Sequence, residues 1–139
     1  MSATVNTLGD LTMTLPCETL SVRAARRELE RLLRDAGWAL LDIEAAQLAV
    51  TELVANAVVH ARSDVVVRCR VAGDLRLEVT DSAGDAELRP RSVTHEDLGG
   101  RGLSLVETMS RSWGVERGSG TKTVWCELEP HREDLAATG

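Results

Sequence analysis

Three polar side chains lie four positions apart in the otherwise apolar segment 50–61, namely Glu52, Asn56 and His60. In a helix this spacing places all three on one face. An amide oxygen is a suitable ligand for Mg²⁺, and a carboxylate one turn away can accept a proton from a hydroxyl or water that attacks a terminal phosphate. The alternative is structural: backbone or arginine groups can satisfy Glu52 and Asn56, and His60 can interact with the last carbonyls of the helix.

Two further stretches have residue types suited to nucleotide chemistry. The stretch VTDSAGD contains Asp81, whose carboxylate can accept a hydrogen bond from an exocyclic amine, and Gly84, beside which a flat ring can approach. Aspartate and glycine also form plain turns. The stretch LGGRGLSLV places Gly99, Gly100 and Gly102 directly before a helical pattern. Free backbone N–H groups and the positive end of the helix dipole favour phosphate at such a place, although the stretch is not a Walker motif.

The rest of the pattern predicts the elements that position these residues. In order, we expect a strand at 11–17, helices at 18–37 and 41–61, a strand pair at 64–81, a helix at 100–113 and a strand pair at 113–129. Asp42 is the expected N-cap of the second helix. Because the strand pairs are hairpins, we expect an α+β two-layer sandwich with a mixed, mostly antiparallel sheet and helices on one face. Residues 10–128 form one domain in this prediction, and 1–9 and 129–139 are flexible tails.

Composition excludes several functional classes. The chain has 139 residues, 43% of them hydrophobic, and a net charge of −6, which disfavours binding to a phosphate backbone. It has no Phe or Tyr on which single-stranded bases could stack. No apolar run approaches the roughly 18–20 residues that span a bilayer, and no signal peptide is recognisable. Three widely spaced cysteines fit reduced thiols. We therefore expect a cytoplasmic protein that binds neither nucleic acid directly nor a membrane.

In this order, the stretches resemble the sequence boxes of the GHKL ATPase superfamily, in particular its short anti-sigma factor serine/threonine-protein kinases with a histidine-kinase-like ATPase domain. ELVANAVVHA is similar to the N box, DSAGD to the box that contacts adenine, GGRGLSLV to the glycine box after the lid, and GSGTKTVW to the last strand. The resemblance covers residues 10–128 and implies the Bergerat ATP-binding fold. The short lid favours the anti-sigma type over sensor kinases with longer lids.

The resemblance implies a role for each residue of these boxes. Glu52 is expected to be the catalytic base that activates a serine hydroxyl or water, and Asn56 to coordinate Mg²⁺ between the phosphates. Asp81 is expected to bind the adenine amine, with Gly84 close to the ring. The other expected contacts to ATP lie in the glycine box, the last strand and the end of the long helix: Gly100, Arg101, Gly102, Leu103, Thr121, Thr123 and His60.

Some of these roles stay open at the level of sequence. Either Thr121 or Thr123 is expected to support the adenine or its water, because a strand places both on the same face. His60 either lies near the phosphates or is structural. Ala55 departs from the family, whose members often have a small hydroxyl residue before the asparagine, and its presence removes one polar contact to the nucleotide.

The resemblance implies an ATP-binding regulatory protein that uses Mg²⁺. The expected function is an anti-sigma factor with serine protein kinase activity, whose partners are an anti-sigma factor antagonist of the STAS type, a sigma factor, or both. The alternatives are a non-catalytic module that sequesters a protein in an ATP-dependent way, and a nucleotide-binding domain with an unrelated regulatory output. Relatives commonly dimerise, so a homodimer is possible. The arginine-rich first helix and the lid, at about 85–98, are the expected partner contacts.

Overall fold

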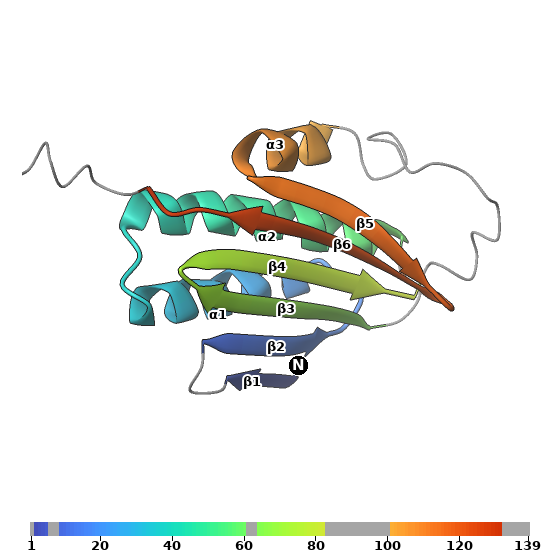
Figure 1. Cartoon of the computed structure of the whole chain (residues 1–139). Coiled ribbons are helices and arrows are strands. Elements are labelled where there is room, and N and C mark those ends of the chain that lie inside the picture. Colours follow the sequence, from blue (N-terminus) through green and yellow to red (C-terminus); the bar gives the residue numbers. More distant parts are fainter. Residues whose placement is uncertain (1, 6–8, 61–63, 83–100, 132–139) are drawn as a thin grey trace, which may run out of the picture.

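A computed structural model describes residues 2–5, 9–60, 64–82 and 101–131 of the chain. The described elements follow one another as β1 (Ser2–Val5), β2 (Asp10–Leu15), α1 (Leu20–Asp35), α2 (Leu40–His60), β3 (Val65–Ala72), β4 (Asp74–Asp81), α3 (Arg101–Met109), β5 (Ser112–Gly118) and β6 (Thr121–Leu128). Figure 1 shows their arrangement. From the second strand onward, this order agrees with the prediction from sequence.

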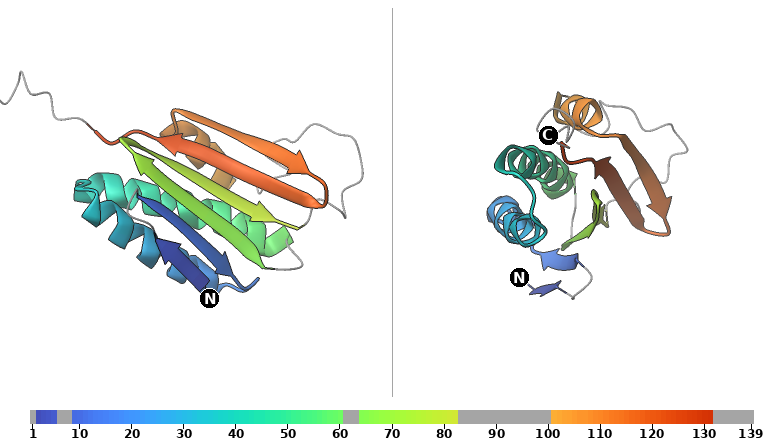
Figure 2. Two further views of the ribbon diagram at one scale, coloured as in Figure 1. Left: turned by 60° about the horizontal axis from the view of Figure 1, so that its bottom comes forward. Right: turned by 60° about the vertical axis from the view of Figure 1, so that its left-hand side comes forward.

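The strands form one six-stranded sheet in the order β1-β2-β3-β4-β6-β5. Every pairing in the described part of the chain is antiparallel. The three helices lie on one side of the sheet, with α2 in contact with both α1 and α3 (Figure 2). The expected α+β sandwich is therefore confirmed, and its described sheet is antiparallel throughout rather than mixed.

Strict alternation of side chains gives each central strand one buried and one open face. In β4, Leu75, Leu77 and Val79 are buried toward the helices, and the residues between them point to the opposite face. In β6, Val124 and Cys126 are buried in the same way. Successive side chains of a strand point to opposite sides of a sheet, so these residues form the sheet half of one core.

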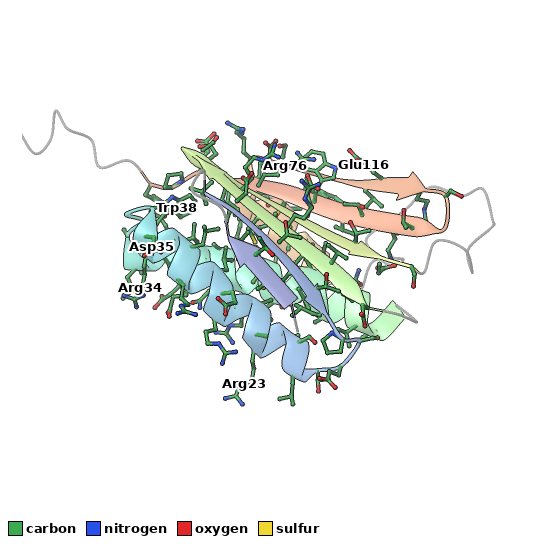
Figure 3. All side chains as sticks on the ribbon, turned by 90° about the horizontal axis from the view of Figure 1, so that it is seen from below. Arg23, Arg34, Asp35, Trp38, Arg76 and Glu116 are labelled. Atoms are coloured by element: carbon green, nitrogen blue, oxygen red, sulfur yellow. The ribbon has the colours of Figure 1, made fainter. Side chains whose placement is uncertain are left out.

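The two long helices differ in how much of their surface is buried. The helix α1 has a single apolar stripe that includes Ala25, Leu29 and Leu33, all buried. Its arginines are exposed, and Figure 3 shows Arg23 and Arg34 pointing away from the sheet. The helix α2 is apolar nearly all round and packs against α1, α3 and the sheet, although Leu41 and Val59 near its two ends remain exposed. None of the three described helices is long and apolar enough to cross a membrane.

The start of α2 differs from the prediction. Asp42 was expected to be the N-cap, but α2 begins at Leu40 and places Asp42 in its first turn. There the buried Asp42 carboxylate accepts hydrogen bonds from the backbone N–H of His131, at 3.0 Å, and from its ring Nδ1, at 2.8 Å. This partner comes from 89 positions away, which local helix-start signals do not reveal.

Both expected tails contain ordered contacts within the described residues. The strand β1 pairs with β2 from Ser2 opposite Thr14 to Val5 opposite Leu11, whereas residues 1–9 were expected to be a flexible tail. Its four residues, SATV, alternate polar and apolar types but are too few to indicate a strand by themselves, and pairing with β2 supports the strand conformation. At the other end, the contact of His131 with α2 continues the ordered chain beyond β6.

Candidate functional site

The polar row on α2 contains one side chain that is buried without a partner. Asn56 is 8% exposed, and neither Nδ2 nor Oδ1 of its amide has a hydrogen-bond partner among the residues described. Leaving a buried amide unsatisfied costs about 1–3 kcal/mol. Glu52, one turn earlier on the same face, is half-buried. Among the described residues, therefore, no backbone or arginine group satisfies the Asn56 amide as the structural alternative requires.

The later turns of α2 and the end of β4 lie at the same end of the sheet. Asp42 in the first turn of α2 contacts His131, which follows β6, and β6 runs antiparallel to β4. The helix α2 therefore begins near the start of β4 and packs along it toward its end (Figure 1). This path carries Asn56 toward the end of the sheet at which Asp81 terminates β4.

Asp81 has a basic neighbour that the sequence boxes did not single out. In the register of β4 and β6, Asp81 lies opposite Lys122. Lys122 Nζ is 3.9 Å from Asp81 Oδ2, and the two side chains are 6% and 1% exposed. The signal for Lys122 was present in the sequence. Asp81 follows Val79 in the buried phase of its strand, Lys122 precedes Val124 in the buried phase of the next, and two buried charges of opposite sign are usually paired.

The two threonines of β6 lie on the opposite face from Asp81. Thr121 and Thr123 flank Lys122 and therefore point to the open side of the sheet. There the hydroxyl oxygens of Thr123 and Thr80 are 2.7 Å apart and share a hydrogen bond. The sequence predicted that one of these threonines would support an adenine held by Asp81. On the face of Asp81, the β6 residue that the structure supplies is Lys122.

The helix α3 brings part of the glycine box beside α2. Arg101 is its first residue, and Gly102 and Leu103 follow in its first turn. The helix packs against α2, with Val106 buried between the layers, and its N-terminal end points toward the same side as the end of α2 (Figure 1). The first backbone N–H groups of a helix have no partners within it, and its dipole is positive there. The start of α3 is therefore suited to bind an anion.

Several expected contacts lie outside the described part of the chain. These are Gly84, Gly100 and the lid at about 85–98. The side chains of His60, Arg101 and Leu103 are also outside it, although their backbones are described. Their predicted roles remain predictions.

A divalent cation at Asn56 would need oxygen ligands from a second source. Within the described ranges, no three His, Cys, Asp or Glu side chains cluster so as to hold a metal ion. Magnesium usually binds one or two protein oxygens and completes its octahedral shell with water and substrate phosphates. The buried, unpaired Oδ1 of Asn56 fits such a minimal protein contribution.

The cysteines take no part in this arrangement. None of the three forms a disulfide. Burial raises the pKa of the Cys69 and Cys126 thiols from 9.0 to about 12. Both thiols therefore stay protonated and unreactive at neutral pH. Cys17 is exposed, and its thiol donates a hydrogen bond to the carbonyl of Val58 at 3.3 Å.

Two cavities have linings that include neither Glu52 nor Asn56. One of about 300 Å³ opens on the sheet face without helices and is lined in part by Arg68 and Arg70. Another of about 570 Å³ lies beside Leu20 and Arg27 of α1. In the first, Arg68 and Arg70 are already paired with Glu78 and Asp10. The site at the end of α2 and β4 is therefore distinguished by its unpaired buried amide rather than by volume.

A solved structure shares this fold. No curated protein matches the sequence significantly. The crystal structure of the RsbU and RsbW domains of Rv1364c from Mycobacterium tuberculosis is similar, with a TM-score of 0.69 and 24% sequence identity. The similarity covers 89% of this chain and 33% of that chain, so this chain spans about a third of its length. It shows that the two share a fold.

A family profile covers most of the chain. The profile of the histidine kinase-like ATPase domain matches residues 15–127, which run from the end of β2 through β6. The matched region includes Asn56, Asp81 and Lys122. The resemblance inferred from the sequence boxes is thereby confirmed, and the chain belongs to the histidine kinase-like ATPase domain family.

Proposed function

We propose that this chain binds ATP with Mg²⁺ and is a cytoplasmic anti-sigma factor with serine protein kinase activity toward an anti-sigma factor antagonist. The observation that carries the proposal is the buried, unpaired amide of Asn56, one turn after Glu52 on α2. Membership in an ATPase family supports nucleotide binding. The similarity to a structure that contains an RsbW domain supports the regulatory class.

Different groups of the chain would bind different parts of the nucleotide. Asn56 Oδ1 would bind Mg²⁺, and Asp81 would accept a hydrogen bond from the exocyclic amine of adenine. The first backbone N–H groups of α3 would bind phosphate oxygens. When bound, MgATP supplies the phosphoryl group and the cation that neutralises charge developing on it.

Glu52 is proposed as the catalytic base. Its carboxylate is half-buried and lies one turn before Asn56 on the same helix face, so it is close to the phosphate end of the proposed site. It would accept the proton of a serine Oγ as that oxygen attacks the terminal phosphate. A partly buried carboxylate beside a cation site can be reached by a partner's side chain while bulk water is limited.

The proposed partners are a STAS-type antagonist, a sigma factor, or both, and a second copy of the chain can form a homodimer. The helix α1 offers exposed arginines for such contacts. Arg31 and Arg34 already pair with glutamates of the same helix, at 3.5 and 3.7 Å. The first turns, with exposed Arg23 and Arg27, are therefore the stronger contact surface.

The proposal is tested by calorimetric titration of ATP, with and without Mg²⁺, into the wild type, Asn56→Ala and Asp81→Asn. We expect micromolar, Mg²⁺-dependent binding to the wild type. Asn56→Ala should weaken binding at least tenfold with Mg²⁺ and little without it. Because the amide has no hydrogen-bond partner among the described residues, the free energy of unfolding of Asn56→Ala should differ from that of the wild type by less than about 1 kcal/mol. Binding to Asn56→Ala with unchanged Mg²⁺ dependence would contradict the proposal.

Glu52→Gln separates the kinase from a sequestering module. With a purified antagonist and labelled ATP, the wild type should transfer phosphate, and Glu52→Gln should bind ATP normally but lose transfer at least a hundredfold. A stable complex of the wild type with the antagonist, without transfer, would favour the non-catalytic module. Normal transfer by Glu52→Gln would show that the assigned base is wrong.

A further inference from the structure

A second charged side chain, that of Lys122, lies beside Asp81 at the end of the sheet. Asp81 and Lys122 are opposite each other on neighbouring strands, and both point toward the helices. Their side chains are 1% and 6% exposed. Lysine is rarely buried to this degree without a specific partner, so its place beside Asp81 needs a reason.

The separation of the two groups leaves Lys122 with donors to offer. Lys122 Nζ is 3.9 Å from Asp81 Oδ2, a distance typical of an ion pair but too long for a hydrogen bond. An ammonium group carries three N–H donors and no acceptor, whereas a carboxylate only accepts. Side by side, the pair presents one acceptor and one donor on the helix face of the sheet.

This combination is complementary to one edge of adenine. Adenine has an exocyclic amine that donates, flanked on each side by a ring nitrogen that accepts. We propose that Lys122 is a base-recognition residue; this inference rests on the proposed ATP site. Asp81 accepts from the exocyclic amine, and Lys122 donates to the ring nitrogen beside it. A purine with a carbonyl at that position presents an acceptor to Asp81 and is disfavoured.

Atom-specific analogues of ATP test this with the unmodified protein. Purine riboside triphosphate lacks the exocyclic amine, and 1-deaza-ATP and 7-deaza-ATP each lack one of the flanking ring nitrogens. We expect purine riboside triphosphate and one of the two deaza analogues to bind about tenfold or more weakly than ATP, because each loses a hydrogen bond to a charged group. Inosine triphosphate should bind at least as weakly.

Lys122→Met then identifies which contact the lysine makes. We expect it to weaken the binding of ATP about tenfold. The affinity for the sensitive deaza analogue should stay unchanged, because that analogue lacks the ring nitrogen to which Lys122 would donate. Lys122→Arg should restore part of the discrimination. If Lys122→Met does not fold, the double variant Asp81→Asn/Lys122→Met is compared with Asp81→Asn, so that the two proteins differ only at Lys122. Arg76→Met, which removes a basic group from the other face of the sheet, is the matched control.

The outcomes separate this inference from the function on which it rests. If both deaza analogues bind as tightly as ATP, or if Lys122→Met weakens all analogues by one common factor, Lys122 only balances the charge of Asp81 and the inference is overturned. Failure of the folded wild type to bind ATP at all would overturn the proposed function together with this inference.

Discussion

Each face of the sheet carries an ion pair that involves β4, but one pair is partly exposed and the other is buried. On the open face, Arg76 Nε lies 2.7 Å from Glu78 Oε2, and the side chains are 29% and 26% exposed. On the helix face, Lys122 and Asp81 are 3.9 Å apart and almost fully buried. Figure 3 shows Arg76 on the side away from the helices.

The shorter pair is expected to be the weaker determinant of stability. Water screens the open face, and Arg76 has further partners there: Glu127 at 3.9 Å and the ring of Trp125, whose centre is 4.3 Å from the guanidinium carbon. When one of these contacts is lost, Arg76 keeps the others. On the helix face both charges are almost fully buried, and removing either takes a neighbouring opposite charge away from the other. Burial therefore decides more than distance.

The largest expected effect comes from removing the buried cation. Lys122→Met should lower the free energy of unfolding by about 3–5 kcal/mol, because it removes the cation beside the buried Asp81 carboxylate. The measurement is urea unfolding in the absence of nucleotide. Adding Asp81→Asn should recover most of the loss. If the single and double variants are equally destabilised, the charge of Asp81 is not the cause.

An intermediate effect is expected from the thiols on the helix face at alkaline pH. Burial raises the pKa of Cys69 and Cys126 to about 12, against 9.0 when unfolded. Above pH 9 the unfolded chain releases these protons while the folded chain retains them. The thiols therefore contribute stability that is fully present below pH 9 and is lost as the pH rises toward 12, by up to about 1.4 kcal/mol per pH unit and thiol.

The comparison of variants isolates this effect from other groups that titrate in the same range. Urea unfolding between pH 8 and 10.5 should show a shallower pH dependence for Cys69→Ala/Cys126→Ala than for the wild type. Cys17→Ala, which alters an exposed thiol, should follow the wild type. Parallel curves for all three proteins would contradict the assigned origin.

The smallest expected effect is on the open face. Arg76→Met should cost about 1 kcal/mol or less, since a partly exposed ion pair and a cation–π contact each contribute little in water. Added salt should reduce the cost further. Equilibrium unfolding at low and at 1 M salt measures both. A loss as large as that of Lys122→Met would show that exposure does not distinguish the two faces.

Much of the fold could be predicted because local patterns and packing agree. The apolar stripe of α1 and the all-round apolar surface of α2 predicted one edge helix and one central helix, and both are found. The hairpins also agree, with glycines at the turns: Gly73 and Gly120 have φ of 83° and 74°, values that favour glycine. Here tertiary structure reinforces what each segment prefers alone.

The parts that were missed depend on contacts between distant residues. The strand β1 exists through pairing with β2, and Asp42 binds His131 instead of capping α2. In the site, the row of Glu52 and Asn56 was visible because helical spacing is local. For Lys122, strand alternation indicates a buried position, but its place opposite Asp81 depends on the register between β4 and β6. The last-strand box predicted contacts from Thr121 and Thr123, which flank Lys122 and point to the open face.

The junction of β4 and β6 also affects when the proposed nucleotide site forms during folding. Thr80 and Thr123, which meet across it, are 43 positions apart, whereas β3–β4 and β5–β6 are local hairpins. Closing a long loop costs more entropy than closing a short one, so we expect the junction to form after the hairpins. Asp81 and Lys122 stand on opposite sides of it. A chain with both hairpins formed but without pairing between β4 and β6 lacks the proposed nucleotide site. We therefore expect ATP to bind only chains in which β4 and β6 have already paired.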